Sequence, residues 1–434
     1  MSTAGQIHDQ LSGSKLTLET GRNISLNLEP FAELGVLDSL DDDLVRLAAY
    51  VFAGDLAIKR HEREQHLRSI TLRVPVVNIQ AFERVRKLVE KALMTLSTDN
   101  WTIEFVPLLG RAPASNRSWP TKTTSTLLFS GGLDSFAGSL FLLKSEPVIT
   151  LVSHVSHNRH VKSSQSKLAK VVREFTGKDI KHLQISVFGR NHGGLTFPTD
   201  SDREDTQRTR SFLFTALAAI AARLEGSRRV LVMAENGQFA IHLPLSEARI
   251  GSFSTHTAHP KFLAQMQELL RQLFVCDDLE VTNPFVFHTK GEVVGFIPKE
   301  LRRKIHDSTS CWRAARMATT HTHCGECVPC LCRRIALETH GIKLSEYQRD
   351  LLTENIGTLP PDDLGKRNLM DLCQFIMLFG GPHKITSEEQ LCYEFPELFD
   401  PDLNAAKIIA MYRRFAVEAL NIFQKYPKVK VLLK

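Results

Sequence analysis

The chain has 434 residues, which is long enough for two or three domains rather than one ordinary core. Its composition is that of a globular protein, and no apolar run reaches the roughly 18 residues that a membrane span needs. The formal net charge of +6 suits ligands that carry phosphate, but it is too small to indicate direct nucleic-acid binding. The first ten residues lack the basic start and apolar core of a secretory signal, so we expect a cytoplasmic protein.

Residues 1–122 contain no recognisable catalytic motif and predict an N-terminal extension of mixed α+β type. The apolar patterns of Thr71–Ile79 and Trp101–Leu108 predict strands, and that of Ala81–Leu96 predicts an amphipathic helix. The following stretch, Gly110–Thr124, is rich in Pro, Ser, Thr and Arg and is typical of a linker. We therefore place a domain boundary there.

From Ser125 onward, strands and helices alternate. The predicted strands are Thr126–Phe129, Val148–Val155, Leu183–Phe188 and Val230–Ala234, and the predicted helices between them are Asp134–Lys144, Ser163–Phe175 and Thr206–Leu224. This alternation predicts an α/β domain over residues 123–344, a parallel sheet with helices on both faces. Residues 345–434 are predicted to form a mainly helical C-terminal region.

The first of these strands leads directly into Ser130-Gly131-Gly132-Leu133-Asp134-Ser135, where a helix begins. The glycines allow the backbone to turn tightly against a phosphate, and the helix directs unsatisfied N–H groups at the same place. Ser130 and Ser135 add hydroxyl donors, and Asp134 either holds a magnesium ion or caps the helix. The segment Phe129–Ser135, with Leu133 between the glycines and Asp134, is therefore the predicted nucleotide-binding site, although a plain strand–turn–helix corner is the alternative.

Five of the eight cysteines lie between Cys311 and Cys332, and none lies before Cys276. Cys324, Cys327 and Cys330 form a C-x2-C-x2-C run, which together with Cys311 predicts a closed, structural zinc site of four thiolates. His321, His323 and Cys332 are spare ligands by sequence. An iron–sulfur cluster and free buried cysteines are the alternatives.

The loop resembles the SGGxDS signature of the PP-loop ATP pyrophosphatases, and the loop and cysteines together resemble the 7-cyano-7-deazaguanine synthase family, QueC. That family ends in a motif that Ser310-Cys311, Cys324–Cys330 and Arg333 match here. Weaker matches are His157-Asn158-Arg159-His160, Arg210-Ser211 and Lys290-Gly291-Glu292-Val293. The resemblance covers about residues 123–342 and implies the PP-loop, adenine nucleotide α-hydrolase-like fold.

The resemblance implies an ATP-dependent C–N ligase. A 7-deazaguanine carboxylate would attack the α-phosphate of ATP, pyrophosphate would leave into the loop with magnesium, and an amine would attack the adenylate. Ser130, Asp134, Ser135, Arg159, Arg210 and Lys290 are the implied catalytic residues. Weaker candidates for the substrate pocket are Phe239, Arg249, Phe253, His256 and His259.

Several features depart from the housekeeping enzymes of the family. Ser211 replaces an asparagine, the loop between the first two zinc ligands is longer, and residues 235–263 do not match the segment that binds the deazaguanine. Both terminal extensions are also extra, and this long form looks most like the QatC-type proteins of bacterial anti-phage defence operons. That likeness implies a partner protein from the same operon as the amine, docked on residues 1–122.

Three other functions stay open. One is 7-cyano-7-deazaguanine synthesis for queuosine, with ammonia as the amine. Another is a different PP-loop branch, such as a tRNA thiolase or an amidotransferase, although the chain has no cysteine near the loop or in residues 1–122. The third is a nucleotide-binding assembly protein without catalysis.

Overall fold

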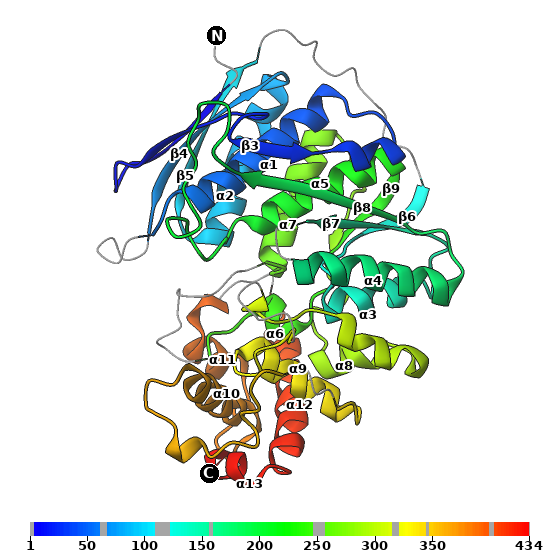
Figure 1. Ribbon diagram of the computed structural model, residues 1–434, viewed down its shortest axis with the longest axis vertical. Helices are drawn as coiled ribbons and strands as arrows, with labels where there is room; N and C mark the ends of the chain where they lie inside the picture. Colours follow the sequence, from blue (N-terminus) through cyan, green and yellow to red (C-terminus); the bar gives the residue numbers. More distant parts are fainter. Residues whose placement is uncertain are drawn as a thin grey trace.

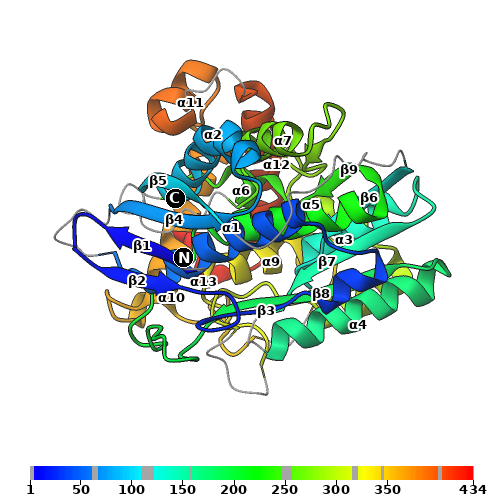
Figure 2. The same cartoon turned by 90° about the horizontal axis from the view of Figure 1, so that it is seen from above.

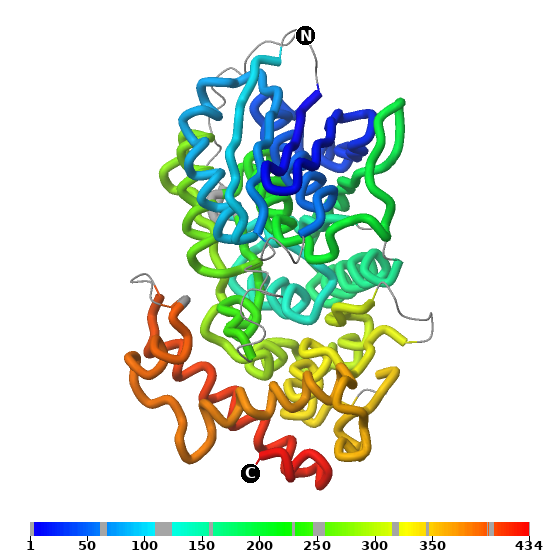
Figure 3. The backbone as a smooth tube through the Cα atoms, turned by 90° about the vertical axis from the view of Figure 1, so that its left-hand side faces the viewer, coloured from blue at the N-terminus to red at the C-terminus, as the bar shows by residue number. Residues whose placement is uncertain are grey.

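A computed structural model describes residues 4–60, 67–108, 122–155, 159–245, 257–314, 321–343, 347–398 and 403–433. Most of the linker predicted at 110–124 lies outside these ranges. An α/β part and a helical part lie one above the other in Figure 1, and the two termini lie at opposite ends of the molecule in Figure 3. None of the helices in the described ranges combines the length and apolarity that crossing a bilayer requires.

The N-terminal region forms a four-stranded sheet of its own. Its strands, in the order β2-β1-β4-β5, are β2 (Lys15–Leu18), β1 (Gly5–Asp9), β4 (Ser69–Val76) and β5 (Asn100–Pro107). The helix α2 (Ile79–Ser97) connects β4 to β5, which are parallel. The helix α1 (Ser39–Ala57) is capped by Asp38, whose carboxylate accepts the backbone N–H groups of Leu40 and Asp41. Figure 2 shows this sheet to one side of α1.

The central sheet has six strands in the order β10-β9-β6-β7-β8-β3. They are β10 (Val281–Thr282), β9 (Ser227–Val232), β6 (Lys122–Leu128), β7 (Ile149–His154), β8 (Lys181–Gly189) and β3 (Ile24–Asn27). The strands β10, β9, β6, β7 and β8 are parallel. The helices around this sheet are α3 (Leu133–Leu142), α4 (Arg159–Thr176), α5 (Arg210–Glu225) and α7 (Pro260–Phe274). Because α3 and α4 lie below the sheet and α1 and α5 above it, the predicted α/β class is confirmed (Figure 1).

The N-terminal region and the central sheet share one core. The strand β3 pairs antiparallel with β8 at the edge of the central sheet, with Ile24 opposite Gly189. On the apolar side, α1 packs on α5 and α2 packs on α7, and one continuous cluster of buried side chains joins all four helices. Residue 122 therefore does not separate two independent cores.

The C-terminal region is helical, as predicted, and forms a second core together with Ile241 and the buried side of α9 (Val328–Thr339). The helices of the lower part are α6 (Gly237–Ile241), α8 (Lys290–Gly295), α9, α10 (Leu364–Gly380), α11 (Glu388–Glu394), α12 (Ala405–Phe423) and α13 (Pro427–Lys430). Short 3₁₀ helices are η1 (Glu29–Glu33), η4 (Lys299–Asp307), η6 (Ile356–Thr358), η7 (Pro396–Leu398) and η8 (Val431–Leu433). The helix α12 contacts α6, α8 and α9, so the last part of the chain packs directly beneath the central domain.

Candidate active site

The predicted nucleotide loop lies between the carboxyl end of β6 and the first turn of α3, which begins at Leu133. Gly131 has a φ of +75°, in the left-handed region that favours glycine. A Cβ atom at this position would lie 2.8 Å from the backbone nitrogen of Gln165 on α4, so only glycine fits between the loop and that helix. The close packing fixes the loop at the edge of the sheet where open parallel sheets bind ligands.

Two serine hydroxyls lie beside each other in this loop. The Oγ atoms of Ser130 and Ser135 are 3.2 Å apart, and Ser130 Oγ also accepts the backbone N–H of Gly132 at 3.2 Å. Ser135 Oγ donates to the carbonyl oxygen of Gly132 at 3.1 Å. The arrangement provides hydroxyl groups and helix N–H groups together, as an anion site requires.

A buried cluster of charged groups lies next to the loop. Lys290 Nζ donates to Asp134 Oδ2, and Asn236 Nδ2 donates to Asp134 Oδ1 at 3.1 Å. Burial and the neighbouring Asp134 raise the pKa of Glu235 to about 8, against the opposing effect of Lys290 and Arg210. Burial also lowers the pKa of Arg210, although the nearby Glu235 acts in the opposite direction and raises it. The cluster therefore holds two cations and two carboxyl groups that depend on one another for charge balance.

These groups surround a cavity of about 700 Å³, which is within the usual range for small-molecule sites. Of the predicted site residues, the cavity wall includes Phe129, Ser130, Gly132, Asp134, Ser135, Arg210, Phe239 and Lys290. The fold therefore brings most of the candidate residues named from the sequence to one cavity. Lys290 Nζ also lies 5.4 Å from the ring centroid of Phe239, which the sequence offered only as a weak candidate.

Other candidates lie elsewhere. Arg159 is exposed at the first residue of α4 and is not part of the cavity wall. His259 caps α7, because its Nδ1 accepts the backbone N–H of Lys261 at 3.2 Å. The remaining candidates lie outside the described residues: His157, Asn158, Arg249, Phe253 and His256.

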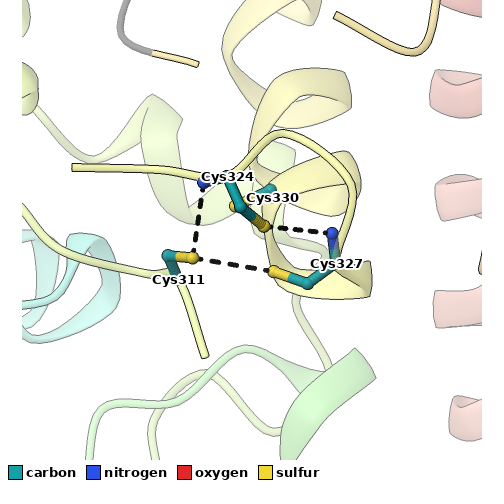
Figure 4. Close-up of side chains that lie close together, drawn as sticks. All are labelled: Cys311, Cys324, Cys327 and Cys330. Carbon is teal, nitrogen blue, oxygen red and sulfur yellow. Dashed lines mark hydrogen bonds between the residues drawn. The ribbon is translucent and has the colours of Figure 1, made fainter. Parts of the chain in front are cut away.

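The four cysteines predicted to bind metal converge, as Figure 4 shows. The Sγ atoms of Cys311, Cys324, Cys327 and Cys330 all lie within 4.8 Å of one another. Cys311 and Cys327 are 4.0 Å apart, and Cys324 and Cys330 are 3.9 Å apart. Zinc–sulfur bonds of about 2.3 Å in a tetrahedron require sulfur atoms roughly 3.8 Å apart, so the four thiols fit a zinc ion.

Two of the further ligands suggested by the sequence, His323 and Cys332, do not belong to the four-cysteine group. The pKa of His323 is lowered to about 2 by burial and by the nearby Arg333, and its neutral ring accepts the backbone N–H of Ser310 at Nε2, 3.1 Å away. Cys332 lies on α9 outside the four-cysteine group. His323 therefore supports the segment that leads into Cys311.

The four-cysteine group is connected to the nucleotide loop through residues 305–310. Arg333, which is fully buried, donates to Ser308 Oγ at 2.7 Å and to the carbonyl oxygen of Ile305 at 2.8 Å. The next residue, Thr309, donates its backbone N–H to the carbonyl oxygen of Gly131 at 3.1 Å. Cys311 also lines the cavity, so the metal site forms part of its wall.

The C-terminal region supports Lys290. Thr289 caps α8 and donates its hydroxyl to Glu418 Oε1 on α12 at 2.6 Å. A Cβ atom at Gly291 would lie 2.6 Å from Glu418 Oε2, so the carboxylate lies directly against the first turn of α8. The backbone N–H of Lys290 itself donates to Gln238 Oε1 at 2.6 Å. Two separate elements thus fix the position of this lysine.

Sequence reasoning missed Glu235, Asn236, Gln238 and Glu418. One signal was present for the first two, because they lie three and four residues beyond the end of β9, and the strand ends of a parallel sheet meet at one edge. Nothing in the sequence near Gln238 or Glu418 indicates a distant partner.

Comparison with known proteins agrees with this geometry. A family model described as "Queuosine biosynthesis protein QueC" matches residues 124–341, half of the chain. No curated protein matches the chain. The matched residues include the nucleotide loop, the buried cluster around Asp134 and Lys290, and all four cysteines. The chain belongs to the QueC family.

Proposed function

We propose that the chain is an ATP-dependent C–N ligase that activates a 7-deazaguanine carboxylate as its adenylate and transfers the acyl group to an amine. The observation that carries this proposal is the buried pair of Asp134 and Lys290 beside the hydroxyls of the SGGxDS loop, at the wall of one large cavity. Membership of the QueC family supports ATP-using, deazaguanine-related chemistry.

The reaction has two steps. A carboxylate oxygen bonds to the α-phosphorus of ATP while the bond from that phosphorus to the bridging oxygen of the β-phosphate breaks, and pyrophosphate leaves. An amine nitrogen then bonds to the acyl carbon, the bond to the AMP oxygen breaks, and the nitrogen loses a proton. In both steps negative charge develops on phosphate oxygens, so fixed donors and cations supply the stabilisation.

Six polar residues of the cavity wall have a role in this scheme. The N–H groups at the start of α3 and the hydroxyls of Ser130 and Ser135 receive the departing pyrophosphate. Lys290 and Arg210 offset negative charge from the phosphates and the substrate carboxylate. Asp134 and Glu235 offer the oxygen ligands that Mg²⁺ prefers, and the ion would neutralise the β-phosphate when bound.

For the acceptor we propose a partner protein from the same operon, in an anti-phage defence system of the QatC type. Two features support a macromolecular acceptor. Half of the chain lies outside the family match. In addition, Trp312 lines the cavity while 51% of its surface stays exposed, so an aromatic side chain is available at the point where the cavity meets solvent.

The test is pyrophosphate and AMP release from ATP by the purified chain with 7-carboxy-7-deazaguanine. Release that requires the acid is expected, and release without it, or none at all, would contradict the adenylation step. Mass spectrometry of the protein encoded next to this chain, after incubation with all substrates, should then show a covalent mass increase. An unmodified protein together with free 7-cyano-7-deazaguanine would instead favour nitrile synthesis for queuosine.

A further inference from the structure

Part of the cavity wall is aromatic and is built by the N-terminal extension together with the central sheet. Phe52 of α1, His154 at the end of β7 and Phe214 of α5 all line the cavity. The ring of His154 lies 5.6 Å from that of Phe52 and 5.2 Å from that of Phe214, measured between centroids. We refer to these three residues as the aromatic wall. Flat aromatic rings of this kind favour a planar ligand.

Gln207 lines the same cavity in an unusual backbone conformation. Its φ is +46°, in the left-handed region that costs a residue with a side chain roughly 1 kcal/mol or more. Within the part of the chain that the structure describes, no hydrogen bond joins its side-chain amide to another group, whereas its carbonyl oxygen accepts the backbone N–H of Arg210. A strained residue with an unused amide at a cavity wall points to a ligand.

The residues on both sides of Gln207 are fixed by the N-terminal extension. Thr209 donates its backbone N–H and its hydroxyl to Asp55 Oδ2, at 2.9 and 3.0 Å. Thr206 accepts a hydrogen bond from Arg60 Nη1 at 3.0 Å, and Arg208 donates to the carbonyl oxygen of Ser97 at 3.2 Å. The chain on either side of Gln207 is therefore attached to α1, α2 and the residues that follow them.

This attachment is itself rigid. Arg68 and Asp99 are fully buried, and Arg68 bonds to both Asp55 and Asp99, while Arg60 Nη2 donates to Asp99 Oδ2 at 2.6 Å. Burial alone would raise the pKa of Asp55, but the guanidinium groups of Arg68 and Arg60 hold it below its ordinary value, so Asp55 stays charged. The buried network can thus hold Gln207 in a conformation that the segment would not adopt alone.

We propose that Gln207 recognises the hydrogen-bonding edge of a planar purine-type ring that lies against the aromatic wall. The amide offers an acceptor oxygen and two donor hydrogens, which match the mixed edge of such a ring. Two substrates of the proposed function carry this chemistry, the adenine of ATP and the 7-deazaguanine acid, and to that extent the inference rests on that function. It assigns a substrate-binding role to the N-terminal extension, which lies outside the family match.

The experiment measures binding without turnover, by calorimetry on the full-length chain. The ligands are α,β-methylene-ATP alone and 7-carboxy-7-deazaguanine alone. Gln207→Ala is expected to lower the affinity for one of the two ligands at least about tenfold, which is the effect of losing one hydrogen bond to a buried group. The ligand whose affinity falls carries the ring that Gln207 recognises. Gln80→Ala, which removes an exposed glutamine from the first turn of α2, should leave both affinities unchanged.

Two further variants separate recognition from folding. Gln207→Gly removes the amide but suits the left-handed backbone, so it should lose the same affinity while melting no lower than the wild type. Gln207→Glu offers only acceptors, so it should weaken the binding of the same ring, because a mixed edge needs a donor beside an acceptor.

Wild-type affinity for both ligands in Gln207→Ala and Gln207→Gly would overturn the inference, as would a wild-type chain that binds neither ring. If binding depends on Gln207 but the chain releases no pyrophosphate, the proposed function fails and the inference stands.

Discussion

Thr309 donates its backbone N–H to the carbonyl oxygen of Gly131, and the nitrogen and oxygen are 3.1 Å apart. Two residues later comes Cys311, the first predicted zinc ligand, so a single short segment touches both the nucleotide loop and the metal site. The hydroxyl of Thr309 also lies 2.7 Å from that of Ser164 on α4. The position of the four cysteines and the shape of the loop are therefore mechanically linked.

We expect Cys324→Ser to lose stoichiometric zinc and to lower the free energy of unfolding by several kcal/mol, because binding energy at a structural zinc site is folding energy. Pyrophosphate release should fall with it, since Thr309 loses its fixed position. Elemental analysis measures the zinc content, and denaturant unfolding measures the free energy of unfolding. Cys392→Ser, on α11 and outside the cluster, is the matched control and should change neither. Full zinc content in Cys324→Ser would refute the site.

Asp134→Asn should lower the rate of pyrophosphate release at least about 100-fold while the chain remains folded. The substitution keeps the shape of the side chain but removes the charge that faces Lys290. Ser139→Ala lies on the same helix, where the hydroxyl donates to the carbonyl oxygen of Phe136, and should retain activity. A wild-type rate in Asp134→Asn would mean that the loop is not the site of ATP cleavage.

Glu235 predicts a pH dependence of stability. Its pKa is raised from an ordinary value of 4.5 to about 8, so between these pH values the folded state holds a proton that the unfolded state releases. Its contribution to stability is complete below pH 4.5 and is lost as the pH rises through 8. Glu235→Gln should therefore show a flatter decline in melting temperature across this window. Parallel curves for the two proteins would contradict the raised pKa.

Glu418 tests the contribution of the C-terminal region to the active site. Glu418→Ala removes the acceptor of the Thr289 hydroxyl and the group that packs on Gly291, so Lys290 should lose its exact placement. A fall of about tenfold to 100-fold in turnover is expected. Glu418→Gln keeps an acceptor and should retain most of the rate. Asn421→Ala, exposed on the same helix, is the control, and equal turnover in all three variants would show that α12 has no influence on Lys290.

A chain that lacks residues 1–122 should not yield a cooperatively folded protein. Removal of these residues would take away α1, which packs on α5, and α2, which packs on α7. It would also leave the outer edge of β8 unpaired. The measurements are solubility and the unfolding transition seen by circular dichroism. A soluble truncated chain with a single sharp transition would show that the central sheet is stable without the extension.

The sequence predicted the elements that depend on local pattern. The strand, glycine turn and helix around Gly131 follow from glycine conformation and hydrophobic period, and the four cysteines follow from ligand spacing. The alternation of strands and helices from Ser125 to Ala234 predicted the parallel part of the central sheet for the same reason.

The features that were missed depend on contacts between distant parts of the chain. The strand β3 has four residues, and its partner β8 lies more than 150 positions later, so nothing local indicates the pairing. Gln207 has its conformation because Asp55 and Arg60 fix its neighbours, and Glu418 reaches α8 from near the end of the chain. Arg159 matched a weak motif, but a motif does not say in which direction a side chain at a helix end extends.

The shared core also constrains how the protein is made. Residues 4–108 leave the ribosome before α5 and α7, yet α1 and α2 cover their apolar faces only when those two helices, up to Phe274, have been synthesised. At typical rates of 5–20 residues per second this leaves the apolar faces of α1 and α2 uncovered for roughly ten seconds or more. Such late, non-local contacts slow folding and leave apolar surface open to aggregation. The nascent chain is therefore a natural client for chaperones, and slower translation before Phe274 should lower the yield of folded protein.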